Sequence, residues 1–590
     1  MPTQERRLNG PQTTGREYRN LSRPQFGIRR DNNARILTRD GATLLADVHR
    51  PDVDGRYPAL IAASPYPRQM QDLGAPAGFI EAGATDFWVA RGYVHVIANV
   101  RGTGGSGGTF GFFDLQERRD MYDLVEWAAT QPWCDGNVGM IGISYFAMTQ
   151  LGAAVERPPH LKAIFPVAVT ADLYEAATHH GLANSSFLTP FLSMMGLTSD
   201  RSDTFWRRNP VIALARRILN TPALHRKFAT MNGEAAVTMM RGLLKLPHSA
   251  HPWDSLWLDT MVKRPLRDQW WEDRNLLPLL KNVDIPVYLG CDWENVPLHL
   301  PSTFTAWNAL VDNPNVRVAM LGQFGLTWPW ESLHTEALAW YDHWLKGADT
   351  GIMDGPPIRY VLPGAEGWHT CESWPPPATH RELALRADGA LADDALSDDA
   401  LSDDALSDSE GPAGARRYLT LGAGLNRSKA SSIDPPSTLT WSTAPLPDSV
   451  DVVGDIELRL VASATAMDTA WMATLQDVSP DGTVTDVTAG WLRASLRTVD
   501  EAASRDGAPV LPCTDAVAVP VGQDVVYRIP LVANARRFAA GHLIRLVLAS
   551  DDQDPTTPAI MNFRHASVGT SSLNTVQSSS RLLLPVISAR

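Results

Sequence analysis

The sequence predicts an α/β domain followed by an all-β sandwich, and three observations support this fold class. Strands of the buried type alternate with helical segments in the first third of the chain, at 58–66, 94–100, 138–143 and 163–169. Such alternation is typical of a parallel sheet that helices cover on both faces. Helical periodicity without strands then runs over 171–280, and strand signals without a helix recur from Arg417. These two patterns predict a helical insertion above the sheet and a sandwich at the end of the chain.

Length and composition exclude several classes of protein. At 590 residues the chain is too long for one hydrophobic core, and its 44% hydrophobic and 20% charged residues are ordinary for a globular protein. The net charge of −13 argues against a nucleic-acid partner, because phosphate binding needs a basic surface. No apolar segment has the length of a signal-peptide core or of a membrane span. We therefore expect a cytoplasmic protein without a membrane partner.

The cysteines and the acidic side chains indicate neither a metal nor a cofactor. The four cysteines lie far apart and lack Cys-x-x-Cys spacing, so no disulfide framework and no zinc site is expected. Residues 389–412 repeat the motif Asp-Asp-Ala-Leu-Ser, without the glycine turn and closing glutamate of a calcium loop. A run this acidic cannot bury a core, so we interpret it as a solvated low-complexity loop.

These composition changes suggest the domain boundaries. The first residues are polar and rich in Arg, Asn and Gly, which predicts a disordered arm. The predicted parts are a disordered arm at 1–30, an α/β core at 31–170 and 281–350, a helical cap at 171–280, the acidic loop at 389–412, and a β-sandwich at 351–388 and 413–590.

The segment 136–150 is typical of a nucleophile elbow. An apolar run, 138–143, ends abruptly at Ser144, and residues that suit the first turns of a helix follow. A serine at such a turn lifts its hydroxyl off the sheet and directs the next backbone N–H groups at the group that it attacks. Phe146 stands where the motif Gly-x-Ser-x-Gly has its second glycine. An ordinary strand-to-helix turn with a solvated serine therefore stays an alternative.

Two further segments end at the same edge of the predicted sheet. The strand 58–64 runs into Tyr66, and the strand 94–100 runs into Arg101 and a glycine-rich loop that lacks the motifs of nucleotide-binding loops. Chemistry in parallel sheets gathers at the carboxyl ends of the strands, where Tyr66, Arg101 and Ser144 fall. The predicted cap is rich in aromatic residues and methionine, which indicates a small-molecule substrate with apolar or aromatic groups, unless these side chains only fill the core of the cap.

Three stretches together resemble the CocE/NonD hydrolases, the family of cocaine-esterase and X-Pro dipeptidyl-peptidase type enzymes. They are the Tyr66 turn, the Arg101-Gly-Thr-Gly-Gly-Ser loop with the Gly-x-Ser-Tyr elbow, and the segment Trp-Tyr-Asp-His-Trp-Leu-Lys-Gly at 340–347. The segment 475–482 and the last strands also resemble the jelly roll of that family. The resemblance runs from about Ile36 to the end of the chain, apart from the acidic loop. It implies an α/β-hydrolase core with an inserted helical cap and a C-terminal all-β jelly-roll sandwich.

The resemblance also implies roles for individual residues. Ser144 corresponds to the nucleophile, and the Tyr66 hydroxyl and the backbone N–H of Tyr145 correspond to the oxyanion hole. Asp292 and Glu294 are the carboxylates in the loop where the family carries its catalytic acid, and we favour Glu294.

The family pattern fails at the catalytic histidine. That histidine is expected just after the strand 316–322, where Gly325 stands here, or Leu326 if the loop shifts by one residue. No histidine lies between Gly322 and Ser332. A serine without a base is a poor nucleophile. Candidates for a substitute base are His299, His334 and the pair at 179–180, although packing or surface roles are alternatives for each. Asn99 is a further departure, because the family usually has Asp there.

These observations leave three functional hypotheses open. The first is a serine hydrolase or acyltransferase that acts on an ester or amide through Ser144 with a non-standard base. The second is an isomerase, cyclase or lyase that uses the Tyr66 and Tyr145 donors without hydrolysis. The third is a non-catalytic binding protein. Self-association into a homo-oligomer is left open.

Overall fold

The computed structural model describes most of the chain. The described residues are 13–71, 81–199, 203–208, 251–322, 333–393, 414–420, 437–549, 565–566 and 568–587, with residues 210, 213, 214, 217, 221 and 552. The acidic loop from residue 394 to its predicted end and the position of Gly325 therefore lie outside the described residues.

The first part of the chain folds around one large sheet. Within the described residues this sheet has ten strands in the order β1-β2-β4-β3-β5-β6-β7-β8-β9-β10. Neighbours from β4 to β9 are parallel, and the pairs at both edges are antiparallel. The strands are β1 (Ile28–Leu37), β2 (Thr43–Pro51), β3 (Tyr57–Ser64), β4 (Val94–Asn99), β5 (Cys134–Met140), β6 (Leu161–Ile164), β7 (Val287–Asp292), β8 (Val316–Leu321), β9 (Ile358–Val361) and β10 (Trp368–Cys371). The central strands β3, β4 and β7 are almost completely buried, as expected for a parallel sheet with helices on both faces.

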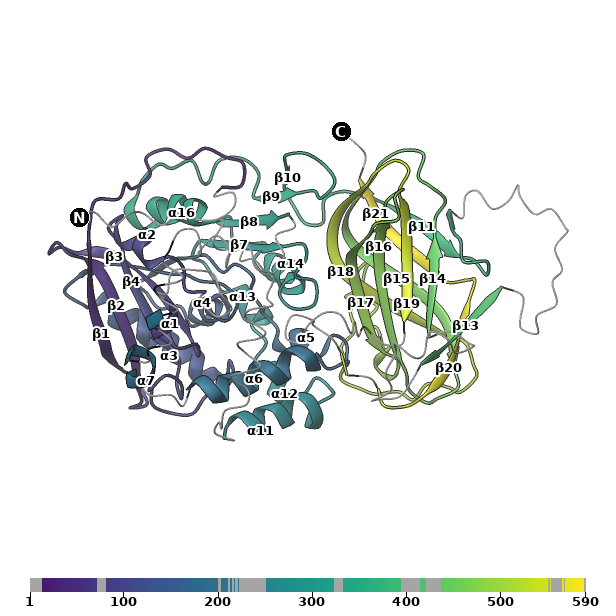
Figure 1. The fold of residues 1–590 in the computed structure, drawn as a ribbon, viewed down its shortest axis with the longest axis horizontal. Coiled ribbons are helices and arrows are strands. Elements are labelled where there is room, and N and C mark those ends of the chain that lie inside the picture. The colour runs from purple at the N-terminus through teal and green to yellow at the C-terminus, as the bar shows by residue number, and fades with distance from the viewer. Residues whose placement is uncertain are drawn as a thin grey trace.

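Helices connect these strands and cover the sheet (Figure 1). The helices of the core are α1 (Arg68–Gln71), α2 (Thr85–Val89), α3 (Leu115–Ala129), α4 (Tyr145–Glu156), α13 (Leu277–Leu280), α14 (Leu300–Ala309) and α16 (His334–Lys346). The N-cap of α3 is Asp114, whose side chain accepts a hydrogen bond from the N–H of Glu117. The C-cap of α16 is Gly347, which has φ of 70°, a conformation that favours glycine.

A group of helices inserted after β6 lies along one side of the core, below the sheet in Figure 1. They are α5 (Leu173–Thr178), α6 (Ser185–Ser199), α7 (Asp203–Arg208), α11 (Trp253–Leu258) and α12 (Gln269–Glu272), with a π-helical turn at Asp259–Lys263. This insertion confirms the helical cap of the predicted fold class.

The C-terminal part is all-β and consists of two antiparallel sheets that pack face to face (Figure 1). One sheet contains β11 (Thr379–Leu385), β12 (Leu391–Asp393), β13 (Ala415–Thr420), β15 (Val450–Ala464), β18 (Val525–Phe538), β20 (Ser572–Gln577) and β21 (Arg581–Ile587). The other contains β14 (Thr438–Ser442), β16 (Ala470–Val478), β17 (Val484–Arg493) and β19 (Leu543–Ala549). Buried aromatic side chains such as Trp441, Trp471 and Tyr527 lie in the core of this domain.

The structure differs from the predicted boundaries in two places. Strands β9 and β10 extend the core sheet beyond β8, although 351–388 was assigned to the sandwich. Short strands of this kind carry no signal for the sheet that they join. Part of the predicted arm, 13–30, is also ordered, because its polar groups bind core carboxylates: Thr14 donates to Glu336, and Ser22 donates to Asp342.

No helix among the described residues is long and apolar enough to cross a membrane.

Candidate active site

Four polar side chains meet at the carboxyl edge of the sheet. Tyr66 follows β3, Ser144 follows β5, Thr170 follows the strand segment of β6, and His299 follows β7. The strands β3, β5, β6 and β7 are consecutive neighbours in the sheet. The chain therefore delivers one side chain from each of four adjacent strand ends, although these residues lie up to 233 positions apart (66 to 299).

Ser144 sits on a strained turn between β5 and α4. It has φ of 56° and ψ of −120°, a backbone conformation that is costly for a non-glycine residue. A Cβ on Gly142 would lie 2.5 Å from the Cβ of Phe146, so the glycine before the serine leaves the space that Phe146 occupies. The N–H of Ser144 donates to the carbonyl of Val167 at 3.3 Å, which anchors the turn to the segment after β6. This geometry matches the predicted nucleophile elbow and explains why the phenylalanine is tolerated in it.

An imidazole contacts the serine hydroxyl. His299 Nε2 lies 3.2 Å from Ser144 Oγ, and His299 Nδ1 lies 3.0 Å from Thr170 Oγ1. The carbonyl of Val169 also accepts a hydrogen bond from the imidazole. With the proton on Nδ1, the imidazole donates a hydrogen bond on the side of Thr170, and Nε2 presents its lone pair to the serine. This is the tautomer that a general base needs.

The surroundings keep His299 uncharged. The side chain is buried, and this burial lowers the pKa of His299 to about 3. The main opposing influence is the hydrogen bond to Val169, which favours the charged imidazolium. No carboxylate of the described residues hydrogen-bonds the imidazole, so a hydroxyl and a carbonyl stand where a catalytic triad has its acid.

Two hydrogen-bond donors lie beside Ser144 on the other side. The Tyr66 hydroxyl hydrogen-bonds the Ser144 side chain, and burial raises the pKa of Tyr66 well above its ordinary value, so the phenol keeps its proton. Tyr145 is the first residue of α4. The following three N–H groups of α4 donate to the carbonyls of Ile143 and Ser144, whereas among the described residues none accepts from the N–H of Tyr145.

The side chain of Tyr145 is held away from the serine by a buried carboxyl group. Its hydroxyl donates to Glu117 Oε1 at 2.8 Å, and the N–H of Phe113 donates to the other carboxylate oxygen at 3.2 Å. The ring of Tyr145 stacks on that of Phe113, with 4.0 Å between ring centroids. Burial raises the pKa of Glu117 to about 8. Glu117 thus links the residue after the nucleophile to a wall of the neighbouring cavity.

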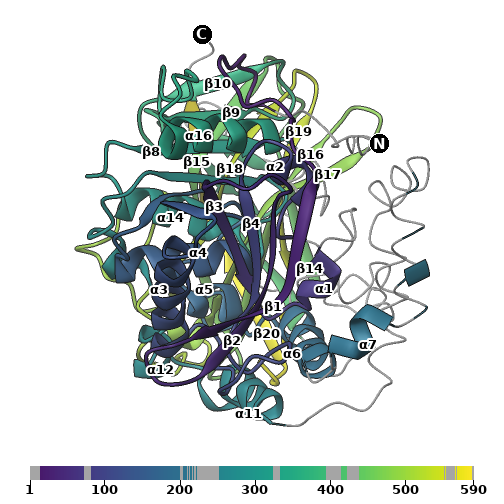
Figure 2. The ribbon, with the colours of Figure 1, turned by 90° about the vertical axis from the view of Figure 1, so that its left-hand side faces the viewer.

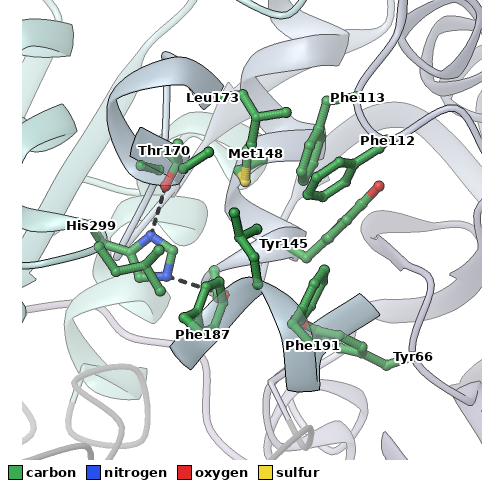
Figure 3. Close-up of a pocket in the computed structure, with 15 residues that line it drawn as sticks. Tyr66, Phe112, Phe113, Tyr145, Met148, Thr170, Leu173, Phe187, Phe191 and His299 are labelled. Atoms are coloured by element: carbon green, nitrogen blue, oxygen red, sulfur yellow. Dashed lines mark hydrogen bonds between the residues drawn. The ribbon is translucent and has the colours of Figure 1, made fainter. Parts of the chain in front are cut away.

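A largely apolar cavity opens onto Ser144. It encloses about 390 Å³, including the space open at its mouth. Figure 3 shows His299 and Thr170 on one side of this cavity and several aromatic rings on the other. Its apolar lining comes from the core loop before α3, from α4, α5 and α6, and from the loop before α14; these residues are Phe112, Phe113, Met148, Leu173, Ala176, Ala177, Phe187, Leu188, Phe191 and Leu298.

The structure does not bring the other predicted site residues to the serine. His334 is buried, and its Nε2 accepts a hydrogen bond from the N–H of Ala84 at 2.9 Å. Glu294 is exposed. Asp292 is buried and accepts a hydrogen bond from the N–H of Glu294, and burial together with that neighbouring carboxylate raises the pKa of Asp292 to about 7.

The paired histidines at the end of α5 contact the C-terminal domain instead. His179 Nδ1 lies 2.6 Å from His565 Nε2, and His180 Nδ1 lies 3.1 Å from the carbonyl of Trp491. Both contacts belong to the interface between the cap and the sandwich, so these histidines are packing residues.

Thr170 was not among the predicted site residues. Its hydroxyl carries no motif, and only the sheet order gives a signal, because Thr170 ends the strand segment that lies between those of Ser144 and His299. The same order explains why His299 reaches the serine. In the turn after β7, the N–H of His299 donates a hydrogen bond to Asn295 Oδ1, and α14 begins directly afterwards.

Two family models match the chain in succession. The model of the X-Pro dipeptidyl-peptidase (S15 family) matches residues 40–325, and that of the X-Pro dipeptidyl-peptidase C-terminal non-catalytic domain matches residues 350–563. The cocaine esterase of Rhodococcus sp. (strain MB1 Bresler) is 27% identical over 557 residues, which cover 88% of this chain and 90% of the esterase. A putative serine esterase of Mycobacterium bovis is 25% identical and covers 90% of this chain, with 91% of its own length matched.

Solved structures share the same architecture. A CocE/NonD family hydrolase from Staphylococcus aureus superposes with a TM-score of 0.70 at 20% identity, over 95% of this chain and 94% of that one. An α-amino acid ester hydrolase superposes with a TM-score of 0.67 at 16% identity, over 98% of this chain and 99% of that one. Both superpositions run over nearly the whole chain, so these two structures share its overall fold.

Proposed function

Because this chain belongs to the CocE/NonD family of X-Pro dipeptidyl-peptidase type hydrolases and is therefore a serine hydrolase, we propose that it cleaves carboxylic esters with an apolar acyl group, using Ser144 as nucleophile and His299 as base. The contact between His299 Nε2 and Ser144 Oγ at 3.2 Å carries this proposal. It is at the upper end of hydrogen-bonding distance, which is common for a site without substrate.

The acylation step follows from these contacts. His299 Nε2 takes the proton of the Ser144 hydroxyl while Oγ attacks the ester carbonyl, and the carbonyl oxygen becomes an oxyanion. The Tyr66 hydroxyl and the N–H of Tyr145 donate to that oxyanion. Each such donor typically contributes about 3 to 4 kcal/mol to transition-state stability. The imidazolium then protonates the departing alkoxide, and an acyl group remains on Ser144.

Deacylation uses the same groups in reverse. Neutral His299 removes a proton from a water molecule, which attacks the acyl-enzyme carbonyl, and Ser144 leaves with the proton returned by the imidazolium. The positive charge that forms twice on His299 is stabilised by the Val169 carbonyl and the Thr170 hydroxyl, in place of a carboxylate. Dipoles stabilise a cation less than a full negative charge does, so this base is expected to be less effective than one paired with an aspartate.

The cavity favours a neutral acyl group. Its described lining is mainly phenylalanine, leucine, alanine and methionine, and none of these described residues carries a carboxylate. A charged ammonium group in this space would lose its hydration without an ionic partner. The acyl group of an aromatic or branched aliphatic ester has no such cost, and its burial against the rings supports binding.

A covalent probe tests the proposal. A fluorophosphonate is expected to label the wild-type protein at pH 7 and to leave Ser144→Ala unlabelled, with His299→Gln labelled at least about a hundredfold more slowly because the base is missing. His160→Gln is the matched control, since His160 is half-exposed and pairs with Glu126 on the surface. Labelling of wild type that is slow and insensitive to His299→Gln would exclude the proposed base. Absence of labelling in folded wild-type protein would favour a non-hydrolytic use of the Tyr66 and Tyr145 donors.

A further inference from the structure

One buried amide holds the turn that carries the Tyr66 donor. Asn99, the last residue of β4, is fully buried, and its Nδ2 donates to the carbonyl of Tyr66 at 2.7 Å and to that of Ser64 at 3.2 Å. Ser64 lies opposite Asn99 in the β3–β4 register, and its side-chain oxygen accepts from the N–H of Tyr66 at 3.1 Å. The peptide groups on both sides of Tyr66 are therefore fixed by direct hydrogen bonds.

Arg68 sets the orientation of that amide. Its Nη1 donates to Asn99 Oδ1 at 2.9 Å and to the carbonyl of Gly104 at 2.7 Å. A guanidinium can only donate, so the amide oxygen must face Arg68 and the amide nitrogen must face the two carbonyls. Gly104 also leaves the necessary space, because a Cβ there would lie 2.1 Å from Asn99 Oδ1. An aspartate at position 99 would place a carboxylate oxygen against the two carbonyl oxygens.

A carboxylate shared with the cap balances the charge of Arg68. Asp47 on β2 lies 3.3 Å from Arg68 Nε, and its two oxygens also accept from Arg207 Nη2 at 2.8 and 2.7 Å. Arg207 belongs to α7, which contacts α1 in the same region (Figure 2). Arg68 and Asp47 are buried, whereas the side chain of Arg207 is partly exposed. A continuous polar path thus connects the cap helix α7 to the Tyr66 turn.

We propose that Asn99 is a positioning residue for catalysis, which places the Tyr66 hydroxyl against the developing oxyanion, and that Arg207 supports it through Asp47 and Arg68. This inference depends on the proposed oxyanion role of Tyr66. The physical reason is that a donor must reach the oxyanion within a few tenths of an ångström, and a displacement of about 1 Å can cost about a hundredfold in rate. Asn99 does not touch the reacting atoms, so its effect must pass through Tyr66.

The test is a pair of double-mutant cycles on the full chain, with p-nitrophenyl esters of apolar acids as substrate. Asn99→Asp is expected to lower kcat about 10- to 100-fold and to change KM less than about threefold, because the cavity itself is untouched. In the Tyr66→Phe background the same change is expected to lower kcat less than about twofold, since the group that it positions is gone. Circular dichroism and thermal melting establish that each variant is folded.

Arg207→Gln extends the test to the cap, and it also serves if Asn99→Asp fails to fold. It removes the two hydrogen bonds to Asp47 from a partly exposed position. We expect a kcat loss of about two- to fivefold that likewise disappears in the Tyr66→Phe background. Arg39→Gln is the matched control, because Arg39 also makes two side-chain hydrogen bonds to one carboxylate, both to Oδ1 of Asp123, away from this path.

The outcomes separate this inference from the proposed function. In the first case, Tyr66→Phe lowers kcat, but Asn99→Asp either leaves kcat unchanged or lowers it by the same factor in the wild-type and the Tyr66→Phe backgrounds. Asn99 then does not act through Tyr66, and the inference is overturned. If Tyr66→Phe itself keeps full kcat while Ser144→Ala is inactive, the oxyanion role of Tyr66 fails, and the positioning role fails with it. Losses in kcat that vanish in the Tyr66→Phe background support the inference.

Discussion

At the ends of β3 and β5, Tyr66 and Ser144 stand at the positions that the family motifs mark, and they contact each other. At the ends of β7 and β8 the marked positions differ: Glu294 is exposed, and a glycine replaces the histidine at position 325. The imidazole that contacts Ser144 belongs instead to His299, five residues after Glu294. The two halves of this sheet edge therefore match the family motifs to different degrees.

This difference shows which part of such a site is tied to a motif. The nucleophile depends on a strained turn with φ of 56°, and a turn of that kind tolerates few sequences. A base needs only an imidazole within reach of the serine and a partner for its second nitrogen. Several neighbouring strand ends can meet that need, and here the ends of β6 and β7 supply Thr170 and His299.

The strongest test of this comparison removes the nucleophile and the base, separately and together. We expect Ser144→Ala and His299→Ala each to lower kcat about 10⁴- to 10⁶-fold, and the double variant to lose no more than the worse single variant, because the two groups act as a unit. Initial rates with an apolar p-nitrophenyl ester measure these losses.

His334→Gln is the control for His299→Ala, because it removes another buried histidine that follows a strand of the same half, β8. Its imidazole accepts from Ala84 rather than from the serine, so kcat is expected to stay within about threefold of wild type if the variant folds. A loss for His334→Gln as large as that for His299→Ala would show that His334 is the base, and the relocated pair described above would be rejected.

The half of the edge at β3 and β5 is tested through the Tyr66 hydroxyl, its proposed oxyanion donor. Tyr66→Phe removes one hydroxyl beside Ser144 and is expected to lower kcat about 10²- to 10³-fold with little change in KM, because the oxyanion forms only in the transition state. The slope of the fluorophosphonate labelling time course is a second readout, since the phosphoryl oxygen needs the same donor. A rise in KM with kcat preserved would contradict the oxyanion role, because it would show that the hydroxyl only helps to bind the substrate.

Sequence motifs and hydrophobic periodicity were sufficient to predict the parts of the molecule whose structure depends on local strain or on burial. The parallel sheet, the helical cap, the all-β domain and the elbow at Ser144 could all be predicted, because buried strands, amphipathic helices and a serine at an abrupt strand end leave local patterns. Phe146 was the doubtful residue in that pattern, and Gly142 accounts for it by leaving room for the ring.

The base and its partner could be predicted only in part. His299 was one of several candidate histidines, and nothing local distinguishes it from His334, since both are single histidines near the start of a helix. Thr170 had no local signal. What decides between them is the order β5-β6-β7 and the turn at Asn295, and both are long-range features of the fold. The short strands β9 and β10 were assigned to the wrong sheet for the same reason.

The pH profile distinguishes a base without a carboxylate from an ordinary triad. Burial lowers the pKa of His299 to about 3, and the neutral form, which acts as base, is present above that pH. We expect kcat/KM to stay nearly constant from pH 5 to 8 and to fall only as the pH approaches about 3. A histidine with a pKa near 6.5 would instead lose about 25-fold between pH 7 and pH 5. An acid limb near pH 6.5 in protein that is still folded would show that the imidazole is not isolated from charge.

The smallest expected effect concerns Thr170, the residue that occupies the place of the acid. Thr170→Val keeps the shape of the side chain and removes the hydroxyl that contacts His299 Nδ1, so we expect kcat to fall about tenfold, in keeping with the loss of one buried hydrogen bond of about 1.4 kcal/mol. Thr170→Asp is the complementary change, because a carboxylate beside Nδ1 favours the imidazolium and raises the pKa of His299. The acid limb of the kcat/KM profile should then move upward, toward the range of an ordinary triad, and kcat at pH 8 should equal or exceed that of wild type. An unshifted limb in folded Thr170→Asp would mean that Thr170 does not face the base, and the two halves of the edge would then differ in more than the origin of their histidine.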